Sequence, residues 1–226
     1  MATGSAAAGG WPVQIVSLPA TQLPAVGALF AGSHGDYPPF RHLFPDPAQR
    51  EQVLRRFFTA TVGDALAFGA VDAALADDDR LVGVAVWLPP GAFPWSARRK
   101  LRSTPMLLGV ARTAPRAFPG LVRMGANAER LHPRERHWNL ETMGVAAAAA
   151  AQGQGIGSRL IAPGLARADI QRLPCYLTTG RAENLRFYHR FGFQVVAEGL
   201  PLVPEGPTSW GMRRPAVDDS QGGGRP

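Results

Sequence analysis

The chain has 226 residues, 46% of them hydrophobic, and 24 Lys and Arg residues against 17 Asp and Glu residues give a formal net charge of +7. This length predicts one compact domain with a substantial core, and no apolar run is long enough to span a bilayer. The single cysteine excludes an internal disulfide, and the N-terminus lacks the basic and apolar segments of a secretion signal, so we expect a cytoplasmic protein.

Both ends of the chain lack hydrophobic periodicity. Residues 1–10 are small or polar, and residues 217–226 are rich in Asp, Ser and Gly. We therefore expect a disordered tail on each side of a single domain over residues 11–216. The basic net charge would attract a phosphorylated small molecule, nucleic acid or anionic lipid alike, so charge alone does not choose among these ligands.

The N-terminal part of the domain predicts alternating strands and helices. Residues 32–45, with His34, Asp36 and Tyr37, predict an irregular loop because they are rich in glycine and proline. Asp46 followed by proline is a typical capped helix start. Three aspartates before Arg80 predict a solvated hairpin tip rather than a calcium loop, which would need a later bidentate glutamate. The expected strands here cover residues 13–18, 65–74 and 81–88, and the expected first helix covers residues 21–30.

A proline-interrupted basic segment, residues 89–136, follows the third strand. Its Thr-Pro and Ala-Pro pairs predict helix starts at Thr104 and Ala114. From Arg98 to Arg136 there are ten basic residues against two acidic ones, a surplus of eight positive charges. The segment is either a helical lid that shapes a binding pocket or a patch for nucleic acid or a membrane surface. Aromatic residues that could stack on bases are scarce, which favours the lid.

The next stretch predicts a strand, a glycine-rich turn and a long helix. Simple alternation along the strand Trp138 to Val145 places Asn139, Glu141, Met143 and Val145 on one face. Glycines at 153, 155 and 157 let the backbone approach a ligand, and a helix with apolar residues at helical spacing begins after them.

Such a turn before a helix predicts a phosphate or pyrophosphate ligand, because the first turn of a helix offers unpaired N–H groups and a partial positive charge. An ordinary strand-to-helix connection is the alternative. The turn lacks the lysine of a P-loop, and Asp169 lies inside the helix rather than at the end of a second strand as a Rossmann fold requires. Further strands are expected over residues 174–179, 194–198 and 209–213, with a helix over residues 183–191.

Two ordered motifs give the chain a family resemblance. Gln152-x-x-Gly155-x-Gly157, after a strand that ends Met143-Gly144-Val145, resembles the coenzyme A pyrophosphate motif of the GNAT acyltransferase superfamily. The run from Asn184 to Phe193 resembles that superfamily's later motif, in which a helix carries a tyrosine toward the thioester sulfur. The segments Asp36-Tyr37-Pro38, Leu173 to Leu177 and Val203 to Pro207 make the chain similar to the puromycin N-acetyltransferase group. The chain departs from that group at two positions, because the group has a glutamate where Thr178 stands and a small residue where Glu141 stands.

The resemblance implies an α/β (α+β) GNAT fold: a central mixed, mostly antiparallel sheet of six to seven strands flanked by helices, with the helical insert between strands three and four. It also implies acetyl-CoA as co-substrate and no metal, and the histidines are too dispersed to suggest a metal site. The residues that it assigns to coenzyme A are Met143, Gly144, Val145, Gln152, Gly153, Gln154, Gly155, Ile156, Gly157, Ser158, Asn184 and Tyr188.

Three residues are candidates for the chemistry. Glu141 is placed to receive the proton of an ammonium, directly or through a water that Asn139 could hold, although a salt bridge to an arginine is its bland alternative. Tyr188 is the candidate donor to the leaving thiolate, although it could simply pack on the sheet. Its ordinary pKa of about 10 exceeds that of a simple thiol, about 8.5, so a hydrogen bond to sulfur is favoured over full proton transfer.

The expected activity is acetyl transfer to the primary amine of a small molecule, an antibiotic or amino-nucleoside-like compound being one candidate. Asp36, Tyr37 and Thr178 would border the acceptor. Acetylation of a peptide or protein amine is an alternative, and a non-catalytic module that binds coenzyme A or nucleic acid is an alternative of another class. No membrane partner is expected, and the enzyme would be a monomer or a homodimer.

Overall fold

The centre of the molecule is a seven-stranded sheet in the order β1-β2-β3-β4-β5-β7-β6. The computed structural model describes residues 13–67, 69–150 and 155–217. Neighbouring strands are antiparallel except β4 and β5, which are parallel, so the predicted mixed sheet is confirmed. The strands are β1 (Val13–Ser17), β2 (Ala70–Ala76), β3 (Leu81–Leu88), β4 (Trp138–Val145), β5 (Cys175–Thr179), β6 (Gln194–Leu200) and β7 (Ser209–Arg214).

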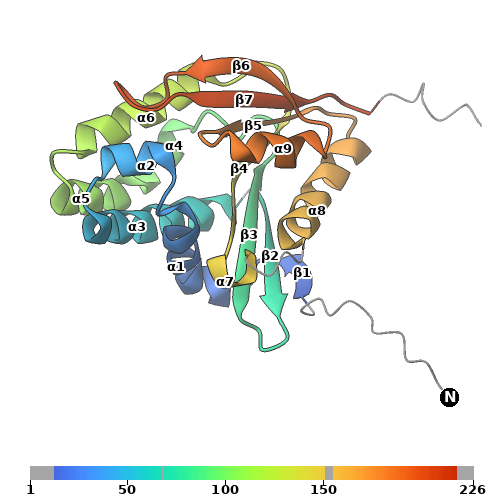
Figure 1. Cartoon of the computed structure of the whole chain (residues 1–226), viewed down its shortest axis with the longest axis horizontal. Helices are drawn as coiled ribbons and strands as arrows, with labels where there is room; N and C mark the ends of the chain where they lie inside the picture. Colours follow the sequence, from blue (N-terminus) through green and yellow to red (C-terminus); the bar gives the residue numbers. More distant parts are fainter. Residues whose placement is uncertain (1–12, 68, 151–154, 218–226) are drawn as a thin grey trace, which may run out of the picture.

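Helices cover both faces of this sheet (Figure 1). One face carries a core built largely from α1, α3 and the insert helices, and the other face carries a core built from α8 and α9. The helices are η1 (Ala20–Gln22), α1 (Leu23–His34), α2 (Pro38–Leu43), α3 (Pro47–Ala65), α4 (Ala97–Arg102), α5 (Thr104–Thr113), α6 (Phe118–Leu131), α7 (Ala147–Ala150), α8 (Ile156–Ile170) and α9 (Glu183–His189).

Strand β3 separates the two cores. Its Val84 and Val86 belong to the core under α1 and α3, while Ala85 and Trp87 belong to the core under α8. The alternation follows from the two-residue period of a strand, and all eight residues of β3 are buried. Helix α8 approaches closely because Gly164 lies over the indole of Trp87: a Cβ at this glycine would be 2.0 Å from a ring atom.

The segment predicted as an irregular loop is mostly helical, so that prediction was wrong. Helix α1 continues to His34, and α2 begins at Pro38 after Tyr37 in an extended conformation. A proline in the first turn of a helix removes an N–H that has no intrahelical acceptor, so the two prolines here start a helix instead of preventing one. The predicted cap at Asp46 is confirmed, because its Oδ1 accepts a 2.6 Å hydrogen bond from the Gln49 N–H.

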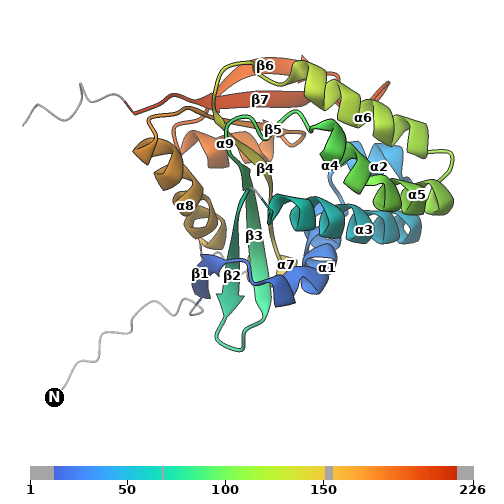
Figure 2. The same cartoon turned by 180° about the vertical axis from the view of Figure 1, so that it is seen from behind.

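The insert between β3 and β4 forms helices α4, α5 and α6, which lie beside α2 and α3 in both views (Figures 1 and 2). The helix start predicted at Thr104 is confirmed, whereas Ala114 ends α5 and the next helix begins at Phe118 with a proline in its first turn. Val110, Ala114 and Leu121 of the insert are buried in the core under α1 and α3. Among the described residues, no helix is both long and apolar enough to cross a membrane.

Candidate active site

The parallel strands β4 and β5 pair over only three residues and then diverge. Their register runs from Trp138 opposite Cys175 to Leu140 opposite Leu177. Beyond that point β4 continues as far as Val145, paired with β3 on its other side. The edge of β4 that faces β5 is therefore open over residues 141–145, and its main-chain groups can pair with an extended ligand.

A β-bulge at Glu141 determines which side chains face this opening. Trp87 of β3 lies opposite Leu140 and Val86 lies opposite Thr142, so Glu141 is the extra residue. Thr142 then faces α1, where its Oγ1 lies 3.4 Å from His34 Nε2. Simple alternation assigned Glu141 and Met143 to one face of the strand, and this prediction was wrong.

The face assignments beyond the bulge follow from the packing. Met143 and Val145 pack against the core under α8, together with Trp138 and Leu140. Gly144 faces α1, since a Cβ there would be 2.6 Å from Ser33 Oγ. A single inserted residue shifts the two-residue period of the strand, and the bulge is not visible in the β4 sequence because it depends on the pairing with β3.

A cavity of about 670 Å³ opens where β4 and β5 diverge. Its walls come from the open part of β4, the end of β5, helix α9, the α1–α2 region and the insert helices. Most of the residues singled out in the sequence therefore line this one cavity. The basic insert forms one of its walls, as the lid interpretation predicts. The singled-out residues that line it are Tyr37, Asn139, Glu141, Met143, Gly144, Val145, Thr178, Asn184 and Tyr188.

Glu141 lies in this cavity with an altered acidity. Asn139 Nδ2 donates a 2.9 Å hydrogen bond to Glu141 Oε2. Burial raises the pKa of the Glu141 carboxyl from 4.5 to about 7, and the nearby Arg99 and the Asn139 hydrogen bond limit the rise. A carboxyl group with this pKa is about half ionised at neutral pH, so it can accept a proton there and release it again.

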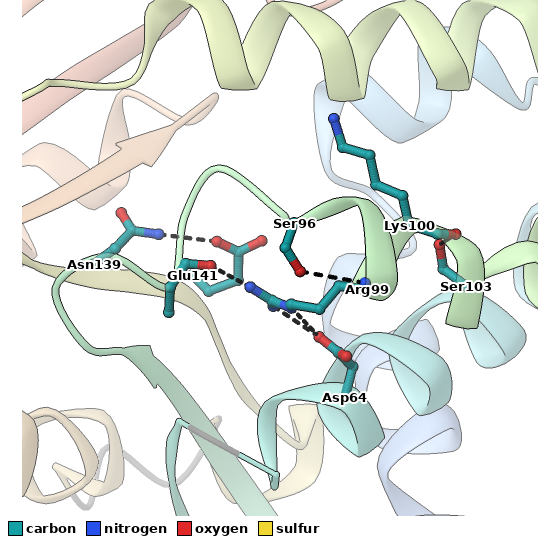
Figure 3. A network of polar contacts seen from close by, with 8 residues as sticks. Asp64, Ser96, Arg99, Lys100, Ser103, Asn139 and Glu141 are labelled. Carbon is teal, nitrogen blue, oxygen red and sulfur yellow. Dashed lines mark hydrogen bonds and ion pairs between the residues drawn. The ribbon is translucent and has the colours of Figure 1, made fainter.

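Arg99 is held by the Asp64 carboxylate and by the main chain of the insert (Figure 3). Its guanidinium binds Asp64 Oδ2 through Nε at 2.8 Å and Nη2 at 2.7 Å, and Nη1 donates to the Ala92 carbonyl. The guanidinium also stacks over the Trp95 ring, 4.7 Å from its centroid. Because α3 and the insert fix its position, Arg99 supplies a constant positive potential near Glu141.

Tyr188 occupies the α9 side of the cavity and is 8% exposed. Burial raises the pKa of its phenol well above the usual 10, and the nearby Tyr37 adds to the rise. The Tyr37 hydroxyl accepts a hydrogen bond from the Gly180 N–H, which connects the α1–α2 turn to the end of β5. Asn184 Nδ2 donates to Thr179 Oγ1 at 3.0 Å and so fixes the start of α9 on the same strand.

The predicted phosphate-binding turn is described only from Gly155 onward, and Gln152, Gly153 and Gln154 lie outside the described residues. Gly155 has φ +67°, a left-handed conformation that favours glycine, and it precedes the first residue of α8. Helix α8 begins with Ile156, Gly157 and Ser158, whose N–H groups belong to the free first turn. These residues do not line the cavity.

Of the two residues of the α1–α2 turn that were predicted to border the acceptor, the structure places one at the cavity. Tyr37 lines the cavity, whereas Asp36 is exposed and does not. Sequence reasoning missed His34, which lines the cavity between Ser33 Oγ, 3.0 Å away, and Thr142. Burial and then the charge of Arg181 lower the pKa of His34 to about 4, so it is neutral at pH 7. A lone histidine in a glycine-rich segment gives no signal of this placement.

Histidines of the insert also gather near the cavity. His132 and His137 lie with ring centroids 4.6 Å apart, although the sequence suggested that they were dispersed. Within the described residues, no group of three or more His, Cys, Asp or Glu side chains could hold a metal ion.

Comparison with known proteins adds a family match. Residues 119–195, from α6 to the start of β6, match the acetyltransferase (GNAT) domain. A crystal structure from Corynebacterium glutamicum, described as histone acetyltransferase HPA2 and related acetyltransferase, has a TM-score of 0.69 at 22% identity and covers 92% of this chain and 98% of its own.

Two further structures share the fold at lower identity. Arylalkylamine N-acetyltransferase 2 from Aedes aegypti has a TM-score of 0.55 at 13% identity, over 90% of this chain and 98% of its own. A phosphinothricin acetyltransferase from Sinorhizobium meliloti, in complex with AcCoA, has a TM-score of 0.51 at 14% identity and covers 90% of this chain and 88% of its own. Residues 119–195 of this chain therefore match the GNAT acetyltransferase domain, and the chain shares its fold with these solved structures.

Proposed function

We propose that the protein transfers an acetyl group from acetyl-CoA to the primary amine of a small molecule, by direct attack in a ternary complex. The observation that carries this proposal is that Glu141 and Tyr188 line one cavity at the point where β4 and β5 diverge. A proton acceptor and a hydrogen-bond donor at one site match the two proton-dependent events of the reaction.

Acetyl-CoA would enter the cavity along the open edge of β4. Met143, Gly144 and Val145 offer main-chain groups there to the pantetheine arm and the thioester carbonyl. The pyrophosphate would bind at the start of α8, where the residues after Gly155 offer unpaired N–H groups and the positive end of the helix dipole, and Gln152, Gly153 and Gln154 are proposed to contribute from the preceding segment. Asn184 would lie beside the pantetheine arm.

Glu141 would act as the general base. The acceptor arrives as an ammonium and passes one proton to Glu141, directly or through a water bound to Asn139. The nitrogen lone pair then attacks the thioester carbon, forming the C–N bond as the C–S bond breaks. Holding both reactants in one cavity supplies most of the rate acceleration, so no covalent enzyme intermediate is needed.

Tyr188 would stabilise the leaving sulfur. The raised pKa keeps its phenol protonated at neutral pH, so the hydroxyl donates a hydrogen bond to the thiolate without losing its proton. Coenzyme A then leaves as the free thiol, because the thiolate takes up, directly or through solvent, the second proton that the attacking nitrogen loses on becoming an amide. This role depends on the position of the hydroxyl rather than on its acidity.

The proposal is tested by calorimetry with coenzyme A and by thiol release from acetyl-CoA across a panel of amines. We expect saturable binding and amine-dependent release. Binding with no release for any amine would indicate a non-catalytic coenzyme A module, and no binding would overturn the assignment of the start of α8. Release with peptides but not with small amines would indicate a peptide or protein acetyltransferase.

A further inference from the structure

The wall of the cavity that faces Glu141 is largely apolar. The insert and the helices it packs on contribute aromatic and aliphatic side chains and few polar ones. They come from α2, α3, α5, α6 and the segment before α4. An amine held at Glu141 therefore extends into an apolar environment. The apolar side chains of this wall are Phe40, Phe57, Phe58, Phe93, Trp95, Met106, Leu107, Leu121, Met124 and Leu131.

The acidic groups of the cavity are few. Among the lining residues, all of which belong to the described part of the chain, the carboxylates are Glu129 and Glu141. Glu129 Oε2 is bound by Lys100 Nζ at 2.7 Å, a contact that joins α6 to α4. Glu141 is thus the carboxylate that remains for a cationic acceptor.

The basic groups of the cavity oppose any further positive charge. Lys100 and Arg181 are the lining residues with a permanent positive charge. His34 and His132 are neutral at pH 7, because burial lowers the pKa of each to about 4. With both carboxylates ionised, the formal charges of the lining sum to zero.

We propose that the acceptor is an amine with a single positive charge on an apolar, preferably aromatic, body. The ammonium would lie at Glu141, and the body would lie against the apolar wall formed by the insert. This inference rests on the proposed acetyl transfer and specifies the substrate class of the same cavity.

Polycationic acceptors are disfavoured by the same arrangement. A second ammonium inside the cavity would lose its hydration without gaining a carboxylate, which carries a large free-energy cost. The net charge of +7 on the chain also repels polycations during approach. Polyamines, aminoglycosides and basic peptides therefore fit this cavity poorly.

The first test compares matched amines with the full-length protein and acetyl-CoA. Thiol release would be measured with 2-phenylethylamine, ethanolamine, spermidine, kanamycin and a lysine-rich peptide. Burying one aromatic ring should raise kcat/KM for 2-phenylethylamine about tenfold to hundredfold above the value for ethanolamine. Spermidine, kanamycin and the peptide should give values below that of 2-phenylethylamine.

The second test alters the ion pair across the cavity. Lys100→Met frees the Glu129 carboxylate, so the ratio of kcat/KM for spermidine to that for 2-phenylethylamine should rise about tenfold. Lys100→Arg keeps a cation opposite Glu129 and should leave this ratio near the wild-type value. The two variants differ at one exposed side chain, so a folding defect does not explain a difference between them.

The outcomes separate the two claims. Preference of the wild type for spermidine, kanamycin or the peptide, or an unchanged ratio in Lys100→Met, would overturn the inferred acceptor class and leave acetyl transfer intact. Absence of thiol release with every amine, while calorimetry detects bound acetyl-CoA, would overturn the proposed function and the acceptor class together.

Discussion

The side chain of Asn139 reaches along its own strand and donates a hydrogen bond of 2.9 Å to the carboxylate of Glu141. The two residues are two positions apart, on the same side of β4, immediately where β5 diverges. The amide thus orients the carboxylate toward the cavity and limits the rise in its pKa that burial causes. A base positioned in this way can be tested through its protonation.

Glu141→Gln should remove the base. In the wild type, burial raises the pKa of this carboxyl to about 7, so kcat/KM should fall as pH decreases below 7, and not only below its ordinary value of 4.5. Glutamine cannot accept the proton, so kcat/KM should fall about 10²–10³-fold and the acid limb near pH 7 should disappear. The measurement is a pH profile of thiol release. Glu135→Gln, at an exposed ion pair with Arg213, is the control and should keep the wild-type profile.

The charge of Arg99 should affect the pH at which activity falls on the acid side of the profile. The guanidinium lowers the pKa of Glu141, so its removal should move the acid limb above pH 7. Arg99→Met alone would leave the buried Asp64 unpaired, and the double variant with Asp64→Asn avoids this cost. Arg98→Met removes the exposed neighbouring charge and should leave the midpoint unchanged. An unmoved midpoint in the double variant would show that Arg99 does not act on the base.

Tyr188→Phe should slow the chemical step without changing cofactor affinity. Loss of one hydrogen bond to the developing thiolate is expected to lower kcat about 10–100-fold, while calorimetry should give the wild-type Kd for coenzyme A. Because the pKa of Tyr188 is raised above 10, its ionisation should cause no loss of wild-type activity between pH 7 and pH 10. A basic limb that vanishes in the phenylalanine variant would instead mean that the phenol transfers its proton.

Gly155→Ala should weaken coenzyme A binding through the backbone. The position has φ +67° and open space where a Cβ would lie, so the cost is conformational and not steric. Alanine in this left-handed region costs about 1–2 kcal/mol, which should raise the Kd for coenzyme A about tenfold if the turn rearranges. Gly155→Asn should have a smaller effect because asparagine tolerates the conformation. Equal Kd values for all three proteins would mean that this turn does not hold the pyrophosphate.

Much of the framework could be predicted from local sequence. Strand β4 and the start of helix α9 fall where the sequence predicts them. The apolar residues at helical spacing in α8 are buried: Ile156, Leu160, Ile161, Leu165 and Ala168. The side of α8 that packs on the sheet follows from a short-range pattern, because the apolar period of the helix alone fixes it.

The parts of the site that escaped prediction depend on distant partners. The bulge at Glu141 arises from the register between β3 and β4, which the β4 sequence does not encode. Phe93 and Trp95 precede α4 without any regular spacing, and their place in the cavity follows from how the insert packs on α3. The same holds for His34, whose role becomes visible only when Thr142 is brought to it from 108 residues away.

The position of the insert along the chain has a consequence for how specificity can change. The side of the cavity where we propose that the thioester binds comes from β4, β5 and α9, whereas much of the wall opposite comes from one continuous segment between β3 and β4. Replacing that segment would alter the choice of amine and leave the handling of the acyl donor largely untouched. A library confined to the insert helices is therefore the most direct route to enzymes that acetylate other amines.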